Sequence, residues 1–483
     1  LIFTGNSAFS IHTPATYNGP VTIDQSTFTN TEVAEFTDNI SVLDSVLNIN
    51  NGATFSGELF TDSLTQVDHT AGVLLVDTQS TAILDGTWDS VGGTFTIASV
   101  ANMQSGSQFT ISSDFLLPGD LTVADTATLH VTGNVELTPT TSSLLVQGSS
   151  ATATFLGPSK IAGTVTADAG SILFDSFVDN ETPDAVIISS NSGTIHLGDG
   201  NFLGNLQTPA VGIPGSFIVT SGKAFTCTAA VQQCDISITN SASFTVSSAA
   251  TFHFESGSFT GVGTIDLQSG ATMVVSDSLT LTPDLQIQGT NSDLIVDGGD
   301  FTLDNTLLSL TAGSHFEIAP AAVFITTNSP VLDISSSTVD FIKPDVEFTN
   351  DSTFLLTNSQ ISHNAFHFRD TSSLSISSGT STIYSSISLT PIRFRENSIL
   401  SVSGPSVAVI QHNMSFEDTS SISIVDGSQL INDAEIDMGT EAIINLTPGS
   451  SLVAGDGNIN IANILNVDNA ILEVDNGNIT LLA

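Results

Sequence analysis

Short segments in which apolar and polar residues alternate recur along this chain, and Gly, Asn, Asp, Ser or Pro separates them. Segments such as FTIAS, LTVAD and ISIVDG alternate over about five residues, which is the period of a β-strand with one buried face. A helical period is nearly absent. The pattern therefore predicts an all-β protein made of short strands and tight turns.

The alternating segments return with a period of about 21 residues, most clearly in the second half of the chain. Two parallel series with one period are typical of a solenoid, in which each turn places its strands above those of the turn before. We predict an all-β parallel β-helix (β-solenoid), right-handed as parallel crossovers usually are, with about 20–22 residues per turn. The first series is Phe244, Ile265, Leu285, Leu307, Phe324, Val346, Phe366, Ile387, Val407, Leu430, Leu452 and Ile471, and the second is Phe252, Met273, Leu294, Phe316, Leu332, Phe354, Leu374, Phe394, Phe416, Ile436, Ile459 and Ile479.

The regularity of the spacing divides the chain into four stretches. Residues 236–483 read as a regular solenoid, and residues 95–174 as a second recognisable stretch of it. Residues 175–235 read as an insertion or junction, because DNETPDA, LQTPAVGIPG and a pair of cysteines interrupt the pattern. Residues 1–94 read as less regular turns at the start of the same solenoid.

The charge balance limits the partners of this protein. It carries 49 Asp and Glu residues against 6 Lys and Arg residues, which gives a formal net charge of -43 at pH 7. Such a field repels nucleic acids and anionic membranes, and it collects counterions, so structural Ca²⁺ at acidic turns is an open alternative. The G-G-x-G-x-D calcium repeat is absent, and no other cofactor is expected.

Cysteine and asparagine usage favours an extracellular or cell-surface protein. Cys227 and Cys234, the two cysteines, lie close together in CTAAVQQC, which favours a local disulfide; two free thiols or half of a metal site are the alternatives. No apolar run is long enough to span a bilayer. The chain starts without Met, and both ends look cut in the middle of the pattern. Asn-x-Ser/Thr sequons, which are candidate glycosylation sites, occur at Asn39, Asn180, Asn350, Asn413, Asn445 and Asn478.

The densest polar cluster lies between His363 and Glu396 and holds three of the six basic residues. Arg369 and Arg393 are 24 residues apart (393 − 369), close to one turn, so they are expected on one face, where they can clamp a sugar or a carboxylate. The competing interpretation is that each arginine pairs with the acid beside it, Asp370 or Glu396. The candidate glycan contacts are His367, Arg369, Arg393 and Arg395.

No residue is assigned a catalytic role, and we expect the protein not to be an enzyme. Glycoside hydrolysis needs two carboxyl groups across a cleft, but neighbouring pairs such as Asp297 with Asp300, or Asp468 with Asp475, arise by chance among so many acids. Neither a G-x-S-x-G elbow nor an H-E-x-x-H zinc motif occurs.

Residues 241–277, SASFTVSSAATFHFESGSFTGVGTIDLQSGATMVVSD, show the texture of the whole repeat region. This texture resembles secreted β-helix repeat proteins: adhesins of the filamentous-haemagglutinin and autotransporter-passenger type, and similar surface proteins of unicellular eukaryotes. The resemblance covers residues 95–174 and 236–483. It implies a solenoid fold and an extracellular setting.

The functional expectation is an extracellular structural or adhesive solenoid, either a rigid rod or a subunit of a filament, sheath or surface coat. Its partners would be copies of itself joined head to tail, because uncapped terminal turns present unpaired strand edges, and also cell-surface glycans. The alternative is a carbohydrate-binding or polysaccharide-cleaving β-helix. A groove walled over one face would favour that alternative.

Overall fold

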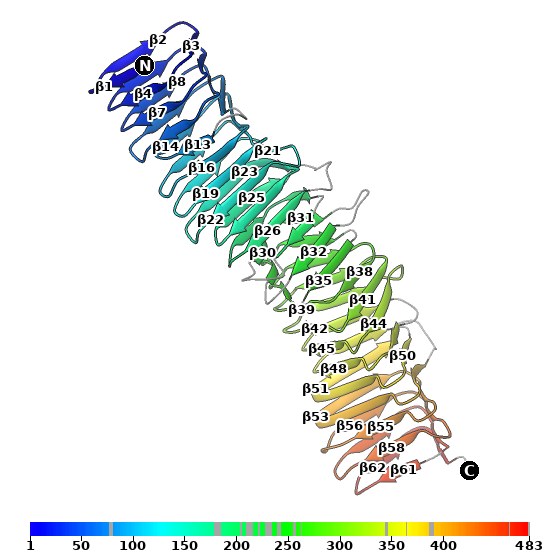
Figure 1. Ribbon diagram of the computed structural model, residues 1–483. Helices are drawn as coiled ribbons and strands as arrows, with labels where there is room; N and C mark the ends of the chain where they lie inside the picture. Colours follow the sequence, from blue (N-terminus) through cyan, green and yellow to red (C-terminus); the bar gives the residue numbers. More distant parts are fainter. Residues whose placement is uncertain are drawn as a thin grey trace. The chain divides into compact units, whose positions relative to one another are not determined.

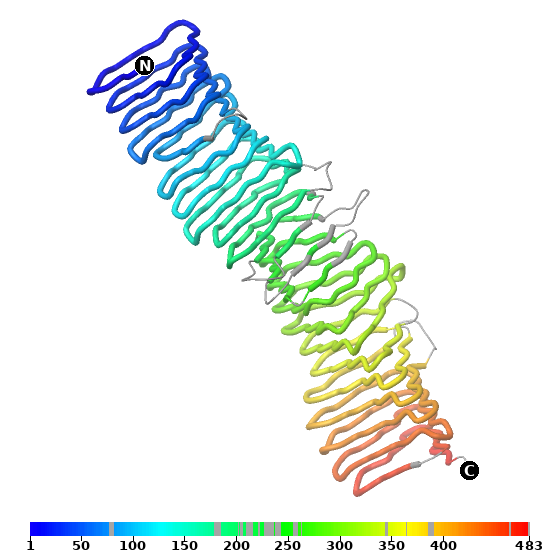
Figure 2. The backbone as a smooth tube through the Cα atoms, in the orientation of Figure 1, coloured from blue at the N-terminus to red at the C-terminus, as the bar shows by residue number. Residues whose placement is uncertain are grey.

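The chain is an all-β parallel β-solenoid, as predicted, and strands make up 62% of it. The protein divides into two compact units, Leu1–Phe244 and Thr245–Ala483. Figure 1 shows the strands of each unit, and Figure 2 shows the backbone winding through successive turns. No described segment forms a helix that is long and apolar enough to cross a membrane. The computed structural model describes residues 1–76, 81–177, 185–202, 205–208, 216–220, 223–227, 234–238, 243–254, 257–261, 263–342, 346–363, 365–385, 391–462 and 464–481.

Turns in the first unit carry three short strands, so the strands form three columns along the stack. One turn contains β19 (Asp120–Ala124), β20 (Thr128–Val131) and β21 (Val135–Leu137). In the next turn β22 (Ser143–Gln147) pairs in parallel with β19. A single long strand, β23 (Thr152–Ile161), then pairs with both β20 and β21. Parallel pairing in register is what aligns inward-facing residues from turn to turn.

The second unit repeats this arrangement. A representative turn contains β41 (Asp300–Asp304), β42 (Leu307–Leu310) and β43 (His315–Ile318). The first column runs through β41 to β44 (Val323–Thr327), where its sheet ends. A new seven-stranded parallel sheet then begins at β47 (Val346–Phe348).

This seven-stranded sheet is the first column for the rest of the second unit. Each of its strands is three residues long. The first and third residues of each strand are buried, except in the last strand, where they are exposed. The strands after β47 are β50 (Phe366–Phe368), β52 (Ile392–Phe394), β54 (Met414–Phe416), β57 (Ile436–Met438), β60 (Ile459–Ile461) and β63 (Ile479–Leu481).

Stacked phenylalanines fill the interior behind the seven-stranded sheet. Phe348, Phe368, Phe394 and Phe416 occupy one register position on four successive strands. Their neighbouring ring centroids are 4.8, 4.9 and 4.6 Å apart, and the ring planes differ by only 8°, 6° and 2°. Aromatic rings at this separation gain from stacking as well as from burial, and Phe brings no hydroxyl that would need a buried partner.

Buried serines line a corner between the second and third columns of the second unit. Ser314, Ser337, Ser359 and Ser381 are all nearly inaccessible to solvent. The hydroxyls of Ser314 and Ser337 are 3.2 Å apart, and the Ser359 hydroxyl accepts the backbone N–H of Ser337 at 3.4 Å. The Ser381 hydroxyl accepts the N–H of Ser359 at 3.3 Å. Neighbouring turns thus satisfy one another's polar groups at the corner, which burial requires.

The predicted period is correct, but each predicted series of apolar residues passes from one column of strands to another. Phe252, Met273, Leu294 and Phe316 do lie opposite one another in the third column. The ladder then continues to Val339, whereas Leu332 belongs to the second column. The reason is that all three strands of a turn share one alternating pattern, so a spacing shorter than a full turn moves the series to the neighbouring strand.

Strands also pair in parallel within the two stretches that read as irregular. In residues 1–94, β4 (Val21–Asp24) pairs with β7 (Ile40–Leu43). Within residues 175–235, β27 (Thr194–Leu197) pairs with β30 (Ser216–Val219). The predicted disulfide of Cys227 and Cys234 lies outside the described side chains, and Asn180 lies outside the described residues.

His363, at the end of β49 (Gln360–His363), is fully buried. Its ring stacks on Phe366 at 4.1 Å and on His412 at 5.0 Å between centroids. Neither ring nitrogen has a hydrogen-bond partner within the described structure. Burial, with a smaller contribution from His412, lowers the pKa of His363 from 6.5 to about 3. The imidazole is therefore neutral in the folded protein at any ordinary pH.

Replacing Phe394 with Ala should destabilise the stack around it by roughly 3–5 kcal/mol, because the change removes a ring from the middle of the phenylalanine stack and leaves a cavity. Guanidinium unfolding and amide hydrogen exchange in β50, β52 and β54 would measure the loss. Ser415→Ala, on the outer side of β54, is the matched control and should change stability by no more than about 0.5 kcal/mol. Equal effects of the two changes would show that the stack contributes little.

Replacing His363 with Leu should stabilise the protein relative to the wild type increasingly as the pH falls from 6.5 towards 3. Over this range the unfolded chain takes up a proton at His363 and the folded chain does not, so wild-type stability falls with falling pH. The difference reaches roughly 2–3 kcal/mol at pH 4.5, since each unit of pKa difference corresponds to about 1.4 kcal/mol.

Melting temperatures of the wild type and the His363→Leu variant between pH 4 and 7.5 would measure this difference. His130→Leu, a half-buried histidine of the first unit, is the control. A His363→Leu difference that does not change with pH would contradict the assigned protonation state.

Candidate ligand-binding hollow

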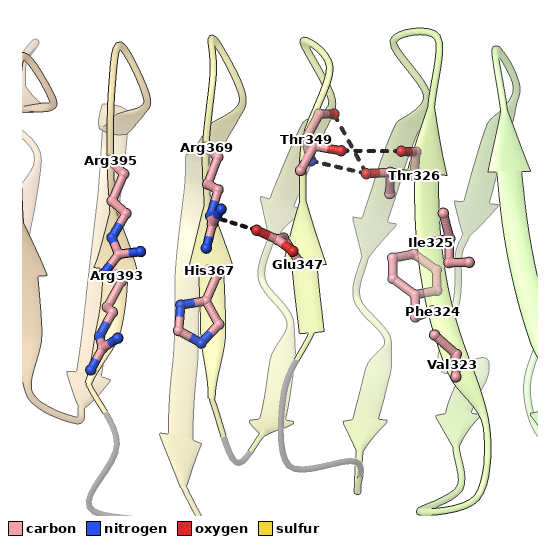
Figure 3. Close-up of a pocket in the computed structure, with 10 residues that line it drawn as sticks. All are labelled: Val323, Phe324, Ile325, Thr326, Glu347, Thr349, His367, Arg369, Arg393 and Arg395. Atoms are coloured by element: carbon pink, nitrogen blue, oxygen red, sulfur yellow. Dashed lines mark hydrogen bonds and ion pairs between the residues drawn. The ribbon is translucent and has the colours of Figure 1, made fainter.

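A hollow of about 570 Å³ lies on the outer face of the second unit, beside the point where the first column passes from the sheet of β44 to that of β47. Figure 3 shows its lining side chains, which project from β44, β47, β50 and β52 or from the residue that follows each of the last three strands. The lining residues are Val323, Phe324, Ile325, Thr326, Glu347, Thr349, His367, Arg369, Arg393 and Arg395.

Side-chain hydrogen bonds hold the two sheets together at this step. The backbone N–H of Thr349 donates to the hydroxyl of Thr326 at 3.0 Å, and the Thr349 hydroxyl donates to the Thr326 carbonyl at 3.3 Å. These bonds join two strands that do not pair with each other in a backbone ladder, since the sheet of β44 ends there and β47 begins a new one. The change of sheet is what creates a concave place on an otherwise regular column.

The four predicted glycan contacts come together on two neighbouring strands. The central residues of β50 and β52, His367 and Arg393, are half-buried on the outer face and lie opposite each other in the ladder. Arg369 and Arg395 occupy the next position along their strands. The backbone N–H of Arg369 donates to the carbonyl of Phe348, and that of Arg395 donates to the carbonyl of Phe368. Arg369 and Arg393 thus share one face, as expected, but as diagonal neighbours.

Two of the three arginines pair with acids from neighbouring turns. The Arg369 Nε lies 2.5 Å from Glu347 Oε1, and the Arg395 Nε lies 2.9 Å from Glu417 Oε2. Neither contact has the alignment of a good Nε hydrogen bond, so we regard both as ion pairs. The ion-pair partners are therefore not the sequence-adjacent Asp370 and Glu396, whose carboxylates accept backbone N–H groups at the turns instead.

Arg393 differs from the other two arginines. Its side chain lines the hollow but makes no hydrogen bond or ion pair with any residue that the structure describes. Among the described residues, two of the three guanidinium groups that line the hollow have a carboxylate in an ion pair, and the guanidinium of Arg393 has none.

Asp370 and Glu396 instead belong to a ladder of acidic turns. Glu396 accepts the backbone N–H of Asp370 at 2.8 Å, and Asp418 accepts that of Glu396 at 3.3 Å. Asp370 in turn accepts the N–H of Asn350 at 3.0 Å, and this bond holds the pKa of the Asp370 carboxyl below its ordinary value. Residues Asn350, Asp370, Glu396 and Asp418 all have φ between 54° and 58°, a left-handed turn conformation.

The remaining candidate residues lie away from the hollow or at its edge. Asp297, Asp468 and Asp475 are exposed residues between strands, and Asp300 is the exposed first residue of β41. No group of three or more His, Cys, Asp or Glu side chains in the described ranges is placed to hold a metal ion.

Five sequon asparagines lie in the described ranges. Asn39, Asn350 and Asn478 are exposed, whereas Asn413 and Asn445 are half-buried. The Asn39 side chain donates to Glu58 at 3.1 Å, and that of Asn350 donates to the Thr349 hydroxyl at 2.9 Å. Glycosylation of these residues stays a prediction.

Sequence reasoning missed Glu347, Glu417 and the four residues of β44 that line the hollow. The acids carried a usable signal, because Glu347, Arg369, Arg395 and Glu417 follow one another at intervals of about one turn. The β44 residues carried none, since the change of sheet is not visible in the alternating pattern.

No known protein-family model matches this chain, and no curated protein sequence is significantly similar to it. The interpretation of the hollow therefore rests on its geometry and charge.

Replacing Thr326 with Val should cost roughly 1–2 kcal/mol and loosen the step between β44 and β47, because the Thr349 N–H then loses its acceptor. Thermal unfolding and the exchange rate of the Thr349 amide hydrogen would measure the effect. Thr302→Val, on the outer side of β41, removes a comparable hydroxyl and is the control. Unchanged exchange at Thr349 would show that the hydroxyl does not hold the step.

Proposed function

We propose that this protein is an extracellular structural and adhesive solenoid whose hollow between β44 and β52 binds carbohydrate. The observation that carries the proposal is a concave site with an uncompensated arginine on a scaffold that is acidic elsewhere. The regular columns serve as the support, and the hollow serves as the contact.

Bonding between turns supports the structural part of the proposal. Successive turns are joined by parallel backbone ladders, by stacked phenylalanines in the interior and by carboxylates at the acidic turns. Each turn contacts its neighbouring turns, and the bonds that join two turns resist bending of one turn against the next. A stiff support of this kind is suited to presenting a binding site.

The residues of the hollow support binding rather than cleavage. Glu347 is the one carboxyl group among the described residues that line the hollow, and Arg369 holds it in an ion pair. Hydrolysis of a glycosidic bond by the usual mechanism needs a second carboxyl group about 5 to 10 Å away on the other side of the bond. The arginines and the hydroxyl of Thr349 are suited to hydrogen bonds with a sugar.

A glycan array probed with the labelled protein tests the proposal. The wild type is expected to bind a defined subset of glycans, and the double variant Arg369→Ala, Arg393→Ala is expected to lose at least nine-tenths of that signal, since each charged hydrogen bond contributes about 1.5–3 kcal/mol. Lys160→Ala, which removes one surface lysine of the first unit, is the control for the loss of a basic residue outside the hollow. Absence of binding by the wild type, or equal binding by the double variant, would contradict the proposal.

Two further measurements test whether the protein cleaves a polysaccharide and whether its copies associate end to end. The size of a bound polysaccharide after long incubation would reveal cleavage, which we expect not to occur. Electron microscopy of the purified chain would show whether copies associate end to end, as the sequence led us to predict.

A further inference from the structure

We propose that the hollow selects a sugar bearing a single carboxylate, an acidic sugar within an otherwise neutral glycan, and that Arg393 is the residue that binds this carboxylate. This inference rests on the proposed carbohydrate binding and names the ligand class. Three features of the hollow support it: the charge balance, the fixed positions of the other arginines, and the acids beside them.

The charge balance sets the charge of the ligand. Arg369 and Arg395 are each compensated by a glutamate, at 2.5 and 2.9 Å, and Arg393 is the remaining positive charge. A monoanion completes the balance, whereas a neutral sugar leaves Arg393 without a counter-charge. Arg393 is half-buried on β52, so a carboxylate bound there is less screened by salt than one bound to an exposed arginine.

The ion-paired arginines prepare the site. Glu347 and Glu417 hold the Nε sides of Arg369 and Arg395, on the turns to either side of the cluster. Long side chains that are already held lose less entropy when a ligand binds. Arg393, whose planar guanidinium matches a carboxylate in a two-point contact, is free to form it.

The surrounding acids exclude a polyanion. Asp370 directly follows Arg369, Glu396 directly follows Arg395, and both belong to the ladder of acidic turns that also contains Asp418. A chain with a carboxylate on every sugar would bring further negative charges towards these exposed acids, which repel them. A single carboxylate avoids this repulsion.

The rest of the lining suits the neutral part of a glycan. The volume of about 570 Å³ lies within the range of small-molecule pockets. Val323 and Ile325, half-buried on β44, offer aliphatic surface for the C–H face of a sugar ring, and the Thr349 hydroxyl lies between them and the arginines.

Calorimetric titration of the whole chain with small ligands tests the inference. The probes are methyl glucuronide, methyl glucoside as its neutral counterpart, acetate, inorganic phosphate and a polyuronate. The wild type should bind methyl glucuronide at least tenfold more tightly than methyl glucoside, acetate or phosphate. Arg393→Gln should lose that preference, whereas Lys160→Gln, which changes the net charge equally, should keep it.

The outcomes separate this inference from the proposed function. Equal binding of methyl glucuronide and methyl glucoside would overturn the role of the carboxylate and leave carbohydrate binding intact. Binding of acetate or phosphate as tightly as the glucuronide would indicate a simple anion site and overturn both proposals. Tighter binding of the polyuronate per sugar would overturn the single-charge argument. If Arg393→Gln binds glucuronide as the wild type does and its circular dichroism spectrum is unchanged, the assignment of Arg393 is wrong. If the wild type binds none of the probes, the inference as a whole is wrong.

Discussion

A single turn of this chain cannot cover its inward-facing side chains by itself, so the turn before it and the turn after it must complete their burial. Everything else in the fold depends on this constraint, because parallel strands in register are what place like residues above one another. Phe348, Phe368, Phe394 and Phe416 stack as a result. The same constraint makes a buried serine bond to a serine one turn away, as Ser337 does with Ser359.

The constraint also explains how a chain with so many acids forms a compact stack. Acidic side chains at the turns accept backbone N–H groups from the neighbouring turn, as Asp370 does from Asn350 and Glu396 does from Asp370. Four basic residues pair with carboxylates from other turns: Lys160, Lys223, Arg369 and Arg395. In the first unit, for example, Lys223 lies 2.9 Å from Asp175 and 3.1 Å from Asp199, and these bonds raise the pKa of its ammonium group.

The hollow exists because the regular stacking changes at one step. Between β44 and β47 the first column passes from one sheet to another, and hydroxyl groups of Thr326 and Thr349 take over from the backbone ladder. Three arginines lie beside this step, and only two of them have carboxylate partners in the described structure. A concave shape and an uncompensated charge thus occur at the same place, which is the physical basis for assigning a function to it.

The sequence by itself determined the fold class, because strand-type alternation that returns about every 21 residues, with almost no helical period, is typical of stacked parallel strands. It also placed His367, Arg369, Arg393 and Arg395 in one cluster, since their spacing matches one turn. It did not determine which strand of a turn each segment forms, as the passage from Phe316 to Val339 shows, because all three strands share one pattern. Only the tertiary structure decided that Arg369 pairs with Glu347 while Arg393 has no carboxylate partner among the described residues, since those contacts depend on which side chains of neighbouring turns face each other.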